Sequence, residues 1–424
     1  MATPLRRIGN GPRGPRRAGR GFTLVELLVA MAAGLVVAAA AFLLSKNATT
    51  FFQHEARISA AQLAATLGMA RISADIQRAS FMASPNIQRD PARCGAVPAA
   101  PPGLASLGGV QIEEDGSTLA WGGQLYQSNI NNFAPDRLVI AGSFSTTEQF
   151  PTQYIDRGGG GGHSIYLQTD AGAMARIRAG VLKGGDDITT IFRAGRMARV
   201  VDLTGRPMYG VIAGTTVVAT NVIVQLEPGT PLQEKLDTND CGVNGLGIGL
   251  MVNPISRIRY ELRSLVGDPI YGSMVNPPVD MTAAQKTATG DVGRTELTRT
   301  EIDAFDAVVS TELVAEYAVD LKFGLTIYDG TPRVLSRLPI PMTAADYANA
   351  GDVAIAGTPE RIRAVQVRLS TRSRAPDRGV ALPAGPDGRL SRFLIDTSLP
   401  PPAYARMRTL YADISLPNQA GIPW

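Results

Sequence analysis

The chain has 424 residues, of which 45% are hydrophobic and 18% are charged. This composition excludes an intrinsically disordered chain and is sufficient for one large or two modest hydrophobic cores. The formal net charge of +4 does not indicate a nucleic-acid partner, because six of the 41 basic residues precede Gly21 and the rest of the chain has more acidic than basic residues.

The first predicted element is an apolar helix over residues 22–44, which follows a basic leader over residues 1–21. At roughly 1.5 Å per residue the helix is about 34 Å long, enough to cross a hydrocarbon core of about 30 Å. Its one charged side chain is that of Glu26. The leader has no acidic residue and contains six arginines, at Arg6, Arg7, Arg13, Arg16, Arg17 and Arg20. This charge bias predicts that the leader stays in the cytoplasm and that the chain after the helix is exported.

The segment from Gly21 to Glu26, followed by the apolar run to Leu44, resembles the class III signal of the type IV pilin superfamily. The resemblance implies that a prepilin peptidase cuts between Gly21 and Phe22, that the new amine of Phe22 is methylated, and that the helix stays in the mature protein. It also implies that Glu26 pairs with the N-terminal amine of a neighbouring subunit and sets the axial register. The residues alone leave open a glutamate that only snorkels to the membrane interface.

The helix is predicted to continue through residues 45–84 as an amphipathic half, because no proline interrupts residues 22–84 and Pro85 ends the element. Apolar residues recur at threes and fours along one face, at Phe51, Ile58, Ala61, Ala65, Met69, Ile72 and Ile76. Another face carries three charged residues that we expect to form weak pairs on the solvent side, namely Arg71, Asp75 and Arg78. A break into two helices near Ser45 or Gly68 is the alternative.

The two cysteines, Cys94 and Cys241, both lie in the part of the chain predicted to be exported. An even count in an oxidising compartment favours one disulfide, which would close a long loop and contribute about 4 to 5 kcal/mol in the chain-entropy view. Two unpaired buried thiols are the alternative.

Residues 85–424 are predicted to form one exported, mostly β domain. Residues 85–106 contain five prolines and predict an irregular connection. Four segments alternate apolar and polar residues, as half-buried antiparallel strands do: 257–263, 317–325, 365–369 and 410–416. More strands are predicted at 136–141, 163–168, 199–203, 209–212 and 215–226. Residues 266–300 and 373–402 are rich in Pro, Gly and small polar residues and are predicted to be long loop insertions.

Several blocks of this domain together resemble the strand series of PilW-type minor pilins: 195–202, 253–260, 312–321, 361–374 and 406–418. The resemblance implies an α+β, pilin-like fold in which a long N-terminal helix packs on a mostly antiparallel β-sheet domain. The long loop insertions depart from the usual pattern.

The sequence contains few residues suited to catalysis or metal binding. Only two histidines occur, and His54 lies on the predicted helix. A His-based zinc site or a Ser-His-Asp arrangement would therefore have to rest on His163, next to a run of five glycines, and neither is favoured. The oxygen-rich segment 237–244 lacks EF-hand spacing, so a polar turn is favoured there and a calcium site is left open. We expect no catalytic residue, no cofactor and no other metal site.

The resemblance implies a minor pilin that takes part in type IV pilus assembly and priming at or near the pilus tip. Expected partners are a prepilin peptidase, the major pilin and other minor pilins, with a tip adhesin as a further candidate. The chain would span the inner membrane once with a periplasmic domain and then enter the cell-surface pilus, where twitching motility and cell adhesion are the expected processes. Two alternatives stay open: a J-type pseudopilin of a type II secretion system, which would usually be shorter, and a membrane-anchored periplasmic binding or adhesive module.

Overall fold

The computed structural model of the protein describes residues 23–96, 99–113, 127–158, 162–169, 188–218, 221–275, 291, 293–328, 330–334, 358–376, 382, 390–396 and 402–421. The chain divides between Ala56 and Arg57 into two compact units, each of which is described on its own. The first contains the start of a long helix, and the second contains the rest of that helix and all of the described strands.

Helix α1 extends from Leu24 to Gln77 without a break, so the prediction of a single long helix is confirmed. The predicted end at Ser84 is wrong. The backbone N–H groups of Arg78 and Ala79 bond three residues back, and the N–H of Ser80 leaves the helix to donate to the carbonyl of Ala141 in the sheet. A hydrogen bond to a distant strand therefore ends the helix before Pro85 is reached, which local sequence could not reveal.

The first sheet has ten strands, and all of its strand pairs are antiparallel. These are β1 (Val110–Glu113), β2 (Arg137–Gly142), β3 (Phe150–Arg157), β4 (His163–Leu167), β5 (Met197–Val201), β6 (Pro207–Val218), β7 (Asn221–Leu226), β8 (Met251–Arg263), β9 (Glu296–Ile302) and β10 (Val308–Ala315). The antiparallel domain predicted from the sequence is thereby confirmed.

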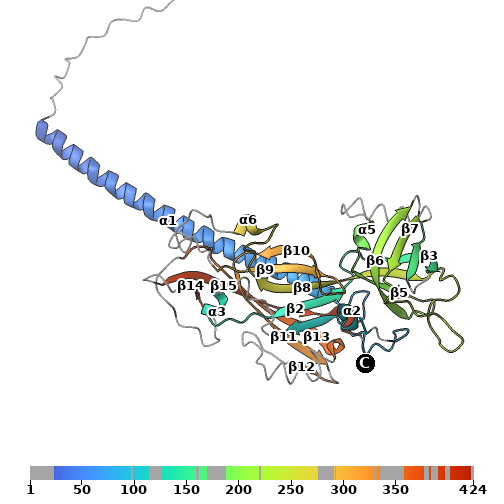
Figure 1. Cartoon of the computed structure of the whole chain (residues 1–424). Helices are drawn as coiled ribbons and strands as arrows, with labels where there is room; N and C mark the ends of the chain where they lie inside the picture. The colour runs from blue at the N-terminus through green and yellow to red at the C-terminus, as the bar shows by residue number, and fades with distance from the viewer. Residues whose placement is uncertain are drawn as a thin grey trace, which may run out of the picture. The chain divides into compact units, whose positions relative to one another are not determined.

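Strand β8 belongs to two structures at once. Its first half, from Met251 to Ile255, pairs with β3 and β5, which closes β8, β3, β4, β7, β6 and β5 into a ring that we call the barrel. Its second half, from Ser256 to Arg263, pairs with β2 and β9 in an open sheet. Pro254 lies where the partners change, a position that suits a residue without a backbone N–H. Figure 1 shows β3, β5, β6 and β7 grouped together, with β11 and β13 in a separate group.

The second sheet has the strand order β12-β11-β13-β15-β14. Its strands are β11 (Ala318–Tyr328), β12 (Pro332–Val334), β13 (Ile362–Arg372), β14 (Arg392–Asp396) and β15 (Ala403–Ser415). Short helical segments connect the described strands: α2 (Pro102–Ala105), α3 (Gln127–Ile130), α5 (Ile188–Ile191), α6 (Gly272–Val275) and the single 3₁₀ turns Pro359–Arg361 and Pro417–Gln419.

The C-terminal half of α1 packs against both sheets. Six of the seven residues of the predicted apolar stripe are buried, namely Ile58, Ala61, Ala65, Met69, Ile72 and Ile76. Three of them, Met69, Ile72 and Ile76, share a core with β8 and with the central strands of the second sheet. At Gly68 a Cβ atom would lie 3.0 to 3.3 Å from Leu369, Ala315 and Leu297, so glycine permits the close approach of helix and sheet.

The structure corrects several strand and loop predictions. Residues 215–226 are not one strand, because 215–218 complete β6 and 221–226 form β7, its antiparallel neighbour. The predicted loop 266–300 contains α6 and the start of β9, and the predicted loop 373–402 contains β14. Strand β9 (Glu296–Ile302) has only two apolar residues, Leu297 and Ile302. Its polar residues Glu296, Thr298 and Thr300 are nevertheless buried, which a loop prediction based on composition misses.

The prediction that Asp75 forms weak pairs on the solvent side of α1 is wrong. Asp75 is 4% exposed, and its Oδ2 accepts hydrogen bonds from the hydroxyl of Tyr260, at 2.7 Å, and from Nε of Arg299, at 2.6 Å. Burial, followed by the adjacent carboxylate, raises the pKa of Tyr260, so its hydroxyl remains the donor. This buried contact, which we call the Asp75 lock, ties α1 to β8 and β9.

Strands β8 and β11 are buried on both faces rather than half-buried. The apolar face of β11 joins the core with α1, while its other face buries Asp320 and Lys322. Nζ of Lys322 lies 2.7 Å from Asp136, and Nε of Arg368 lies 2.7 Å from Asp320. Ion pairing makes the burial of these charges tolerable, which explains how an alternating sequence folds into a doubly covered strand.

Candidate assembly site

The first turn of α1 is closed by Thr23 and Glu26. The hydroxyl oxygen of Thr23 accepts a hydrogen bond from the N–H of Glu26 at 3.2 Å, and Oε2 of Glu26 accepts from the N–H and the hydroxyl of Thr23 at 2.9 and 3.0 Å. This reciprocal arrangement is a capping box, which satisfies backbone N–H groups that have no partner within the helix. The sequence pattern of threonine followed three residues later by glutamate could have predicted it.

The turns that follow present apolar side chains outward. Leu24, Phe42 and Leu44 are 71 to 77% exposed. Helix α1 is long and apolar enough to cross a membrane, judged by its length and composition. An exposed apolar surface of this size needs lipid or other helices to cover it, as in a membrane anchor or in a helix packed within an assembly.

The predicted cleavage residues Gly21 and Phe22 lie outside the described residues. Glu26, the residue predicted to set subunit register, lies in the first turn of α1 and its carboxylate is exposed. Within the described part of the chain, the Glu26 carboxylate accepts hydrogen bonds from Thr23 alone. The register role stays a prediction.

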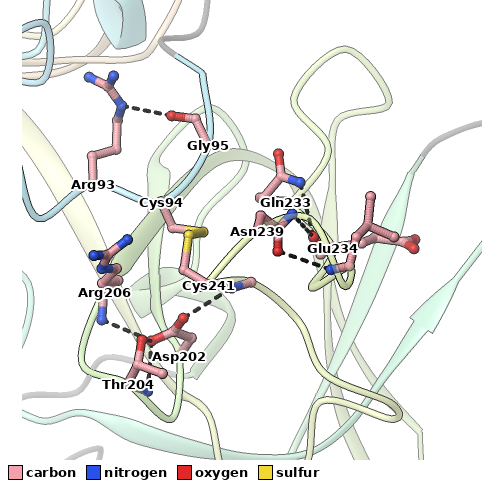
Figure 2. Close-up of a disulfide and its surroundings, with 12 residues drawn as sticks. Arg93, Cys94, Gly95, Asp202, Thr204, Arg206, Gln233, Glu234, Asn239 and Cys241 are labelled. Atoms are coloured by element: carbon pink, nitrogen blue, oxygen red, sulfur yellow. Dashed lines mark hydrogen bonds between the residues drawn. A yellow bond between two sulfur atoms is a disulfide. The ribbon is translucent and has the colours of Figure 1, made fainter.

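The disulfide favoured by the cysteine count is present. Cys94 and Cys241 are joined across 147 residues, and both are buried. Figure 2 shows that the disulfide connects the segment after α1 to the loop that precedes β8. It therefore ties the segment that follows α1 to the barrel.

Asp202, which no sequence pattern singled out, lies beside the disulfide (Figure 2). Its Oδ1 accepts hydrogen bonds from Thr204 and from the N–H of Arg206, and its Oδ2 accepts from the N–H of Gly242 at 3.0 Å. Burial alone would raise the pKa of Asp202, but these hydrogen bonds outweigh it and lower the pKa below its ordinary value. The carboxylate thus holds the β5–β6 turn against the residue after Cys241.

The carboxylate of Asp202 and the two cysteine sulfurs lie within 4.8 Å of one another. A cysteine binds a metal as a thiolate, and both sulfurs here are bonded to each other. The cluster is therefore a structural one in the oxidised protein.

The oxygen-rich loop 237–244 is held by the side chain of Asn239, which bonds to the backbone just before the loop. Nδ2 of Asn239 donates to the carbonyl of Glu234 and its Oδ1 accepts from the N–H of Leu236, each at 2.9 Å. These bonds form the polar turn that the sequence favoured, leading into Cys241.

His163 is buried on β4, and burial lowers its pKa, so the imidazole is neutral at pH 7.

Comparison with known proteins identifies the N-terminal segment. Residues 16–42 match the family model described as the prokaryotic N-terminal methylation motif. No curated protein and no solved structure matches the chain significantly. The motif supports a type IV pilin-like protein that is processed at its prepilin signal by a prepilin peptidase and assembles with other pilins. It suggests a structural rather than an enzymatic protein.

Proposed function

We propose that the chain is a minor pilin, made as a precursor, cut between Gly21 and Phe22, methylated on Phe22 and built into a type IV pilus. The observation that carries the proposal is the methylation motif at residues 16–42, with Glu26 in the first turn of a 54-residue helix. Prepilin cleavage would leave Phe22 one residue before the capping threonine, close in sequence to Glu26.

The proposed step in assembly is an exchange of partners at Glu26. Before assembly its carboxylate caps its own helix through Thr23, and in the filament it would neutralise the amine of a neighbouring subunit. Such a pairing suits a carboxylate in an apolar environment, where an unpaired charge costs roughly 2.5 to 3.5 kcal/mol at the centre of a bilayer. Because a terminal subunit has no neighbour above it, Glu26 favours a position near the tip rather than the outermost one.

The domain after the helix would form lateral contacts with other minor pilins. The Asp75 lock and the buried stripe of α1 hold residues 57–77 against the domain, and the Cys94–Cys241 disulfide cross-links the domain itself. This rigidity suits a subunit whose helix packs in a filament. The assignment to the PilW type and the priming role rest on the strand-block resemblance, and the inner membrane with a periplasmic domain is the proposed site before assembly.

Intact mass tests the proposal. The full chain is coexpressed with a prepilin peptidase and extracted from membranes, and wild type is compared with Gly21→Ala. We expect wild type to lose residues 1–21 and gain one methyl group, and the variant to remain uncut. An uncut chain in both samples would contradict the pilin assignment.

A second experiment tests the role of Glu26. We expect Glu26→Gln to be cut like wild type but to enter filaments poorly, since the amide retains the shape of the carboxylate without its charge. Incorporation equal to wild type would refute the exchange at Glu26 while leaving processing intact.

A further inference from the structure

A row of side chains crosses the outer face of the barrel. Tyr154 of β3 and Tyr166 of β4 are register partners, and their rings are stacked with centroids 4.0 Å apart and an interplanar angle of 16°. Their neighbours Ile155 and Ile165 are buried in the barrel core, so alternation places the tyrosines on the opposite, outer face. Ile223 of β7 is the partner of Tyr166 and extends the row.

A hollow of about 470 Å³ lies at the end of this outer face. Gln168 lies two residues after Tyr166, and Asn221 lies two residues before Ile223, so both face the same side as the row. The hollow is lined by Thr152, Gln153, Gln168, Thr169, Asn221, Ile248 and Gly249, and we call it the barrel hollow. Its volume falls within the range of about 300 to 1,000 Å³ that is usual for ligand sites.

The lining of the barrel hollow determines which ligands suit it. None of the lining residues that the structure describes is ionisable. Phosphate groups and nucleic acids are held by arginine and lysine, and hard cations by carboxylates, so a charged ligand is disfavoured. Amide and hydroxyl side chains instead supply both donors and acceptors, and Ile248, which is 62% exposed, adds an apolar contact. A neutral, hydroxyl-rich molecule with an apolar face matches this lining.

The loop that carries Ile248 is held in place before any ligand arrives. The N–H of Gly249 donates to the carbonyl of Thr152 at 3.0 Å, and the N–H of Thr152 donates to the carbonyl of Leu250 at 2.8 Å. Gly247 and Gly249 have φ of 66° and 76°, a backbone conformation that glycine adopts without strain. A loop fixed in this way loses little conformational freedom on binding, which favours affinity.

We propose that the barrel hollow binds a neutral saccharide. The amides of Gln153, Gln168 and Asn221 hydrogen-bond to sugar hydroxyls, while Ile248 and the neighbouring tyrosine pair contact the apolar face of a sugar ring. This inference does not depend on filament assembly. A failed saccharide test and a failed processing test are therefore distinguishable outcomes.

Saturation-transfer NMR on the full chain in deuterated detergent tests the proposal. The probes are neutral oligosaccharides built from glucose, galactose, mannose, N-acetylglucosamine or N-acetylgalactosamine units. We expect transfer from wild type to at least one probe, and binding about five- to tenfold weaker in Asn221→Ala and in Tyr166→Ala, since each loses one contact group. Tyr328→Ala, which removes an exposed tyrosine of β11, is the matched control and should bind like wild type.

Three results would overturn the proposal. The first is the absence of transfer to every probe, and the second is equal transfer in all variants. The third is crosslinking from a photoreactive residue at position 153 to a neighbouring subunit in assembled filaments, unaffected by the oligosaccharides, because the hollow would then be a protein contact. Asn221 is exposed, so Asn221→Ala keeps the test valid if Tyr166→Ala fails to fold.

Discussion

Removing the carboxylate of Asp75 is expected to destabilise the unit that begins at Arg57 strongly. The side chain of Arg299 is 15% exposed, and Asp75→Ala leaves it, among the described residues, with Glu312 as its ion-pair partner, at 3.6 Å from Nη1. It also removes the acceptor of the buried Tyr260 hydroxyl. Breaking one side of a buried pair costs about 3 to 5 kcal/mol, and we expect about 3 kcal/mol because Glu312 compensates in part. Asp75→Asn, which retains an acceptor oxygen, is expected to cost less.

The measurement is urea unfolding of the full chain in detergent, followed by circular dichroism of the β signal. A loss of about 3 kcal/mol lowers the midpoint by roughly 1 M or more at ordinary denaturant slopes. Arg71→Ala is the matched control on the same helix, because its ion pair with Glu312 is 44% and 48% exposed and should contribute less than about 1 kcal/mol. Equal midpoints for Asp75→Ala and Arg71→Ala would refute the Asp75 lock.

Three further outcomes are expected. Cys94→Ser with Cys241→Ser should lose about 5 kcal/mol in the chain-entropy view, given the 147-residue separation, measured as a lower urea midpoint. The lowered pKa of Asp202 stabilises the fold at pH values above the pKa of an unfolded aspartate, and this contribution disappears as pH falls. Asp202→Asn should therefore lose less stability between pH 7 and pH 3 than wild type. An equal loss would contradict a lowered pKa of Asp202 in the folded protein. Gly68→Leu should lower the free energy of unfolding by about 1 to 3 kcal/mol, because the added side chain overpacks the contact between helix and sheet. Gly34→Ala should leave it unchanged, because no atom lies within 4 Å of the added Cβ. Thermal melting compares the two variants.

The sequence predicted the elements whose chemistry is local. The long helix and the strands around Ile258, Phe323 and Val367 follow from periodicity, which reports the face that meets the core. Periodicity cannot show whether other segments also cover the polar face of a strand, so the buried ion pair of Asp320 and Arg368 was not predicted. Closure of the barrel was also beyond reach, because it depends on which strands pair with Met251 to Ile255.

The candidate site shows the same division. The signal around Glu26 and the cysteine pair can be recognised from the sequence alone, because each depends on particular residue types at particular positions. Thr23 had a readable capping pattern with Glu26, whereas Asp202 had none, because its partners come from its own turn and from Gly242, forty residues away. The sequence around Asp75 is that of an ordinary exposed helical aspartate, because its partners Tyr260 and Arg299 are distant in sequence and come close only in the fold.

Strand β8 has a mechanical consequence. The barrel and the open sheet share one continuous backbone and its hydrogen-bond ladders along β8. A tensile load applied to the barrel would pass along covalent bonds of β8 and, through Tyr260, to Asp75 on α1. Separating the barrel from α1 by force would require several ladders to rupture together, so the domain should extend in a few large cooperative steps under an optical trap.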